Sequence, residues 1–101
     1  MSTLHSWLSG QHLGLGTYRT FQERTMELAL SDGQHAAFYK LLSTMVDPFI
    51  WSFDEEPLPV DVANKTFERV LAVVRDAEYA ISLAPEQQIK ILNELASVEL
   101  V

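Results

Sequence analysis

The chain has 101 residues, of which 48% are hydrophobic and 21% charged, so its composition is that of one globular domain and not of a disordered segment. Fourteen acidic side chains against seven basic ones give a formal net charge of −7, which opposes direct binding to polyanionic nucleic acids. The absence of cysteine excludes disulfides, thiolate nucleophiles and cysteine-bound metals, and it is typical of a cytoplasmic protein.

Residues 1–16 are expected to be loosely ordered. They contain one short helical pattern that carries Leu4, Trp7 and Leu8 on one side and ends at Gly10. No basic residue precedes the apolar positions of this segment, which argues against a secretory signal. The chain has no run of about 18 apolar residues, so we expect no membrane span and no membrane partner.

Two helices are predicted next, over Tyr18–Leu30 and Gln34–Val46. The first buries one stripe, made of Tyr18, Phe21, Thr25, Leu28 and Ala29. The second places Phe38, Leu41, Leu42 and Met45 inward. Asp47-Pro48 is expected to end the second helix, because the residue before a proline avoids helical geometry.

The segment Pro48–Pro59 is predicted to be an ordered loop, since its aromatic residues alternate and no second strand candidate is present. Two interpretations stay open for its apolar side chains. They fold back and fill one end of the bundle, or Trp51 and Phe53 stay exposed beside Asp54-Glu55-Glu56. Aromatic anchors with a charged rim are typical of a protein-binding hot spot.

The longest helical pattern covers Pro59–Ala84, and a last helix is predicted over Glu86–Leu100. The apolar stripe of the longer one contains Val60, Ala63, Phe67, Val70, Leu71, Val74, Ala77 and Ile81, and it is wide enough to meet more than one neighbour. The last helix is expected to bury Ile89, Ile91, Leu92, Leu95, Ala96 and Val98. We therefore predict an all-α fold over residues 1–101, a single small bundle of four main helices with a short extra helix near the amino terminus.

Two polar residues interrupt apolar faces. His35 lies on the inner side of its predicted helix, where a histidine is usually a core residue with one satisfied hydrogen bond. Glu78 lies inside the apolar stripe of the long helix and needs a partner, since burying an unpaired carboxylate is costly. Arg75 is the nearest one along the helix surface. The alternative is a buried pair of Glu78 with His35 or with a tyrosine, lining a polar pocket around His35, Tyr39 and Glu78.

No catalytic constellation is apparent. The serines lack the nucleophile elbow, no triad order is present, and Asp54-Glu55-Glu56 are adjacent in one segment and not on opposing walls. The histidines lack the spacing of paired metal ligands. We therefore expect no metal, no cofactor and no enzymatic activity.

The sequence favours a non-catalytic protein-interaction or regulatory protein. Its partner is another protein, or a second copy of the chain in a two-fold homodimer. The candidate partner-binding residues are Phe49, Trp51, Phe53, Asp54, Glu55 and Glu56, together with the apolar faces of the last two helices. A small-molecule-binding or catalytic domain, with a pocket near His35, Tyr39 and Glu78, is the alternative. A second alternative is an acidic nucleic-acid mimic that inhibits a DNA- or RNA-binding protein, which fits the charge but lacks long one-sided acidic rows.

Overall fold

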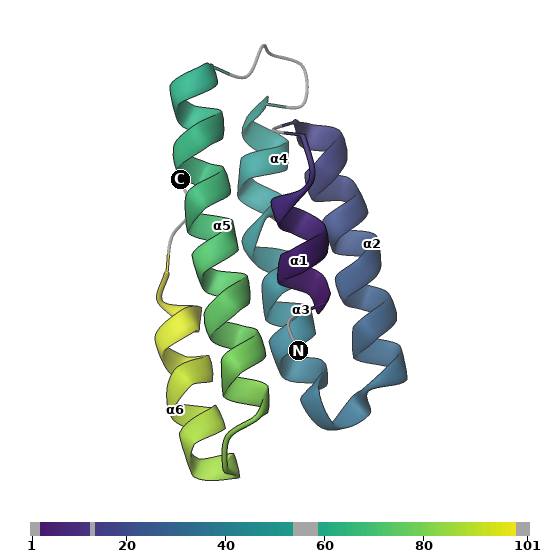
Figure 1. The fold of residues 1–101 in the computed structure, drawn as a ribbon, viewed down its shortest axis with the longest axis vertical. Helices are drawn as coiled ribbons and strands as arrows, with labels where there is room; N and C mark the ends of the chain where they lie inside the picture. Colours follow the sequence, from purple (N-terminus) through teal and green to yellow (C-terminus); the bar gives the residue numbers. More distant parts are fainter. Residues whose placement is uncertain (1–2, 13, 54–58, 99–101) are drawn as a thin grey trace.

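The computed structural model describes residues 3–12, 14–53 and 59–98, and in this part of the chain every regular element is a helix (Figure 1). The prediction of an all-α fold is confirmed. The elements are α1 (Thr3–Ser9), α2 (Leu15–Ser31), the short 3-10 helix η1 (Gly33–His35), α3 (Ala36–Met45), α4 (Asp47–Phe53), α5 (Val60–Ile81) and α6 (Pro85–Ala96).

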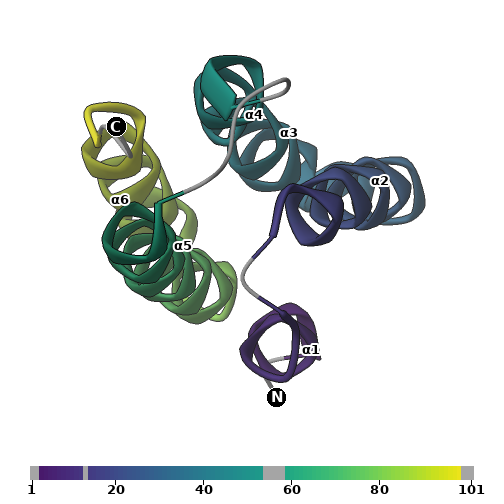
Figure 2. The same cartoon turned by 90° about the horizontal axis from the view of Figure 1, so that it is seen from above.

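The helices pack in an elongated body of 42 × 24 × 21 Å (Figure 1). Its long axis matches α5, whose 22 residues span about 33 Å at the usual helical rise. Helices α2 and α3 form one close pair, α5 and α6 form a second, and α1 packs against α5. Seen along the long axis, α1 stands beside α2 and α5, and α6 lies on the far side of the molecule from α2 (Figure 2).

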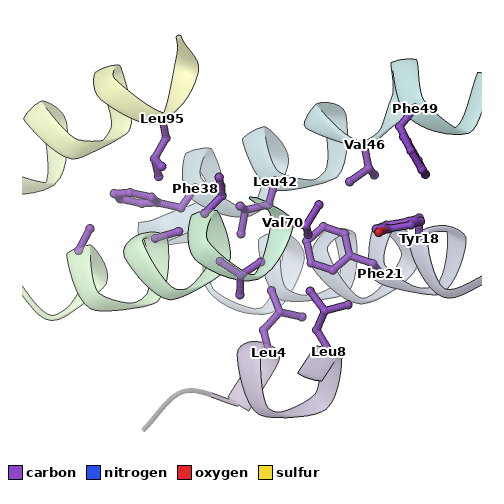
Figure 3. Packing of buried hydrophobic residues seen from close by; sticks show 14 residues of the cluster. Leu4, Leu8, Tyr18, Phe21, Phe38, Leu42, Val46, Phe49, Val70 and Leu95 are labelled. Carbon is purple, nitrogen blue, oxygen red and sulfur yellow. The ribbon is translucent and has the colours of Figure 1, made fainter. Parts of the chain in front are cut away.

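One hydrophobic core runs between these helices (Figure 3). Every α-helix contributes to it: Leu4 and Leu8 from α1, Tyr18 and Phe21 from α2, Phe38 and Leu42 from α3, Phe49 from α4, Val70, Val73, Val74, Ala77 and Ala80 from α5, and Leu95 from α6. The inner stripes predicted for α2 and α3 are confirmed. The amino-terminal segment differs from the expected loose order, because Leu4 and Leu8 are buried in this core.

The buried stripe of α5 is rotated relative to its prediction. Its centre consists of small side chains: Ala63, Thr66, Val70, Val73, Val74, Ala77 and Ala80. The bulkier Phe67, Leu71 and Ile81 lie at the flanks and are partly buried, and Val60 is exposed. Small residues at the centre allow neighbouring helices to approach closely, while the larger side chains cover the edges. The last helix also buries less than predicted, since Ile89 and Ala96 of α6 are exposed, as is Val98 beyond the end of α6.

The segment predicted as a loop after Asp47-Pro48 begins with a helix instead. Helix α3 does end at Met45, but α4 starts at Asp47 and continues to Phe53. Proline is well tolerated in the first turn of a helix, because its missing N–H has no intrahelical partner there. The Ile50 N–H donates to the Val46 carbonyl across the junction, at 3.0 Å. The proline therefore separates two consecutive helices and does not start a loop.

Tyr18 is buried in the core, and its hydroxyl finds no hydrogen-bond partner among the described residues. Burial raises the pKa of Tyr18 to about 12. A buried unpaired hydroxyl is destabilising, so we expect Tyr18→Phe to be as stable as the wild type or more stable by up to about 1 kcal/mol near pH 7.

Alkaline unfolding provides a second measurement for the same variant. The unfolded Tyr18 ionises near pH 10, below its folded pKa, so its stabilisation is complete below pH 10 and is lost as pH rises through 12. Urea titrations should show the wild type losing about 2 kcal/mol more than Tyr18→Phe between pH 9 and pH 11.5. Parallel pH curves would show that the hydroxyl reaches water or accepts a hydrogen bond that stabilises the phenolate.

Candidate functional site

The three aromatic residues predicted to bind a partner are separated by the geometry of α4. Phe49 is fully buried, with its ring centroid 5.1 Å from that of Tyr18 and 5.3 Å from that of Phe53. Phe53 is partly buried, and Trp51 is 81% exposed. Residues two apart on a helix point in nearly opposite directions, so the burial of Phe49 turns Trp51 outward. The acidic residues Asp54, Glu55 and Glu56 lie outside the described residues.

Trp51 lies at the edge of an open groove with a volume of about 690 Å³. Three helices line it: α2 contributes Arg19, Gln22, Glu23 and Met26, α3 contributes Ser43, and α4 contributes Asp47, Ile50 and Trp51. Met26 is exposed like Trp51, so the two give the groove a pair of exposed apolar side chains. We call this surface the Trp51 groove.

Gln22 holds the two sides of the Trp51 groove together. Its Nε2 donates to the Ser43 carbonyl at 2.9 Å and to an Asp47 carboxylate oxygen. These bonds connect α2 to the end of α3 and the start of α4. They link the helices that line the groove, and such links lower the ordering cost of binding a partner.

The polar residues proposed for a small-molecule pocket have other partners in the structure. His35 ends η1, and its Nδ1 lies 2.8 Å from the Asp32 carboxylate. Glu78 accepts the backbone N–H groups of Leu4, at 3.1 Å, and of His5, at 2.9 Å. Arg75, expected beside Glu78, has its guanidinium 3.4 Å from Asp76. Glu78 therefore accepts hydrogen bonds from N–H groups in the first turn of α1 and stabilises this helix. The sequence did not predict this structural role.

Tyr39 lies near both carboxylates. Its side chain is almost fully buried, and burial raises its pKa, with smaller contributions in the same direction from the negative charges of Asp32 and Glu78. The phenol is therefore held in its neutral form and is no base at neutral pH. Asp32 thus contacts His35 and lies near Tyr39, while Glu78 lies near Tyr39, but none of these four residues lines the Trp51 groove or the hollows at α1 and α6.

A smaller hollow of about 330 Å³ lies between α1 and α2. The Arg24 guanidinium sits above the Trp7 ring, 4.5 Å from its centroid, and closes part of this hollow. A cation over an aromatic face is favourable, so this pair helps to hold α1 against α2. The hollow therefore belongs to the attachment of α1 to α2.

Comparison with protein-family models, curated proteins and solved structures finds no match for this chain. Among the described residues, no three histidines or carboxylates gather closely enough to hold a metal ion. No helix in the described ranges combines the length and the apolar character that crossing a membrane requires.

Proposed function

We propose that this chain is a small helical-bundle module without catalytic activity that binds a protein partner through the Trp51 groove. The observation that supports this function is the exposure of Trp51, 81% of whose surface meets solvent on a helix held by the buried Phe49. Tryptophan is among the residues most enriched in binding hot spots, because it buries a large rigid surface at a small entropic cost. Neighbouring Met26 can adapt its shape to a partner.

The charges around the Trp51 groove suggest the chemistry of the partner. Glu23 and Asp47 line the groove, and Asp54-Glu55-Glu56 follow α4 in the sequence. Arg19 is the basic residue of the groove, and the chain as a whole carries a net charge of −7. Complementary charge speeds association and selects partners. We therefore propose a partner segment that inserts an apolar side chain beside Trp51 and carries lysine or arginine at its flanks.

We base on the sequence alone the proposal that the chain has no catalytic activity and is cytoplasmic. No nucleophile elbow or triad pattern is present, and the chain has no cysteine. A protein that works by binding alone is consistent with both observations.

Trp51→Ala tests the Trp51 groove. Photo-crosslinking in the expressing cells, with a photoreactive side chain at position 26 of the groove so that Trp51 stays in place, identifies the partner, and the purified chains then give the affinity. Trp51→Ala should weaken binding of this partner by about 30-fold or more. Its free energy of unfolding should stay within about 0.5 kcal/mol of the wild type, since the side chain is exposed.

Leu30 provides the matched control, because it is 85% exposed, lies one helical turn beyond Met26 on α2 and does not line the groove. Leu30→Ala should leave the affinity unchanged. Equal losses for the two variants would show a non-specific apolar effect and contradict the proposed site. A partner segment without basic residues would contradict the proposed charge complementarity.

A further inference from the structure

A second apolar surface lies along the seam between α5 and α6, on the far side of the molecule from α2 (Figure 2). Tyr79, from α5, is 64% exposed there. It stands between two adjoining hollows of about 270 Å³ each, and both are also lined by Ile91 and Glu94 of α6. Leu83 extends the apolar surface at one end and Val98 at the other. We call this surface the Tyr79 face.

The Tyr79 face carries two side chains of opposite charge. Lys90 and Glu94 are exposed and lie one helical turn apart, about 6 Å along α6. Neither forms an ion pair with another described residue. Both therefore retain a charge that a partner placed on this face can neutralise.

The spacing of these charges makes the Tyr79 face complementary to itself. Lys90 and Glu94 are placed symmetrically about Leu92. If two α6 helices run antiparallel and a two-fold axis crosses them at the level of Leu92, whose side chain packs against the core, Lys90 of each copy faces Glu94 of the other. The same operation brings the end of the face at Leu83 toward Val98 of the other copy. An isologous interface needs this kind of self-complementary pattern.

We propose that the Tyr79 face is a two-fold interface that binds a second copy of this chain. The net charge of −7 on each copy opposes this association. The affinity must therefore come from burial of Tyr79 and from the two matched Lys90–Glu94 pairs. This interface is separate from the Trp51 groove, so a dimer keeps both grooves open, and Trp51→Ala should leave the dimer intact.

Analytical ultracentrifugation of the full-length chain tests the dimer. The mass should rise with concentration from 11.4 kDa to twice this value. Lys90→Glu places two glutamates in each copy of the face, and Glu94→Lys places two lysines there. Each variant alone should dimerise about tenfold more weakly or worse, because like charges then face each other. An equimolar mixture should dimerise again, since every facing pair is then of opposite charge.

Lys65→Glu and Glu68→Lys are the matched controls. Both residues are exposed on α5 outside the Tyr79 face, and the substitutions change the net charge by the same amounts. Neither control should change the dissociation constant by more than the shift caused by net charge alone. All four variants should keep the thermal midpoint of unfolding of the wild type within about 2 °C.

Two results would overturn the proposal. One is a wild-type chain that stays monomeric up to millimolar concentration. The other is a mixture of Lys90→Glu with Glu94→Lys that associates no better than either variant alone, because the antiparallel pairing requires rescue in the mixture. Since Trp51 plays no part in these measurements, either result leaves the proposed function of the Trp51 groove unaffected.

Discussion

Phe49→Ala is expected to lower the free energy of unfolding by about 3–5 kcal/mol, the largest loss among the substitutions considered. The Phe49 side chain is fully buried and contacts the rings of Tyr18 and Phe53. Truncation removes this buried surface and leaves a cavity that the neighbouring helices cannot fill completely. A domain of this size is stable by only about 5–15 kcal/mol, so the variant should show a clear loss in urea denaturation.

Trp51→Ala is the control for this prediction, because it removes a larger side chain two residues away on the same helix. Its stability should remain close to that of the wild type. Similar losses for both variants would mean that α4 presents a different face to the core from the one described. A stable Phe49→Ala variant would contradict the packing of α4 against Tyr18.

Glu78→Ala is expected to lower the free energy of unfolding by about 2–3 kcal/mol. The carboxylate of Glu78 accepts two backbone N–H groups at the start of α1, from Leu4 and His5. Hydrogen bonds to a charged acceptor are stronger than neutral ones, and a negative charge near the amino end of a helix is favourable. Without the Glu78 carboxylate, the N–H groups of Leu4 and His5 lose their hydrogen-bond acceptor. A helix of seven residues is not stable without such tertiary contacts.

Hydrogen exchange measures the local effect of this substitution. The amides of Leu4 and His5 should exchange faster in Glu78→Ala, while amides at the centre of α5 should change only in proportion to the global loss. Glu78→Gln keeps one acceptor oxygen and should fall between the wild type and the alanine variant. Glu68→Ala removes an exposed carboxylate from the same helix and should have little effect. Unchanged exchange at Leu4 and His5 would contradict the role of Glu78.

Part of α4 could have been found in the sequence. Val46, Phe49, Ile50 and Phe53 have the spacing of one face of a helix, and all four are buried or partly buried. The alternation of Phe49, Trp51 and Phe53 suggested an extended segment instead, and Pro48 was interpreted as a stop. Short apolar runs carry both periods at once, so periodicity alone does not distinguish a strand from a helix of seven residues.

The hydrogen-bond partners of Glu78 could not be predicted from the pattern of its own helix. Its place inside an apolar stripe correctly indicated that it needs a partner. The partners are Leu4 and His5, which are 74 and 73 positions away in the sequence. Helical spacing relates a residue only to neighbours three or four positions away, so it pointed to Arg75, whose guanidinium contacts Asp76 instead.

The sequence by itself determined the all-α class, the positions of the long helices α2, α3, α5 and α6 and most of their buried residues, because helical periodicity is a local property of the chain. Only the tertiary structure decided that Phe49 is core while Trp51 faces solvent, that Glu78 holds α1, and that Tyr79 and α6 share an exposed seam. Each of these depends on how segments far apart in the sequence meet. Such contacts are selected by shape and burial across the whole core, and no single segment encodes them.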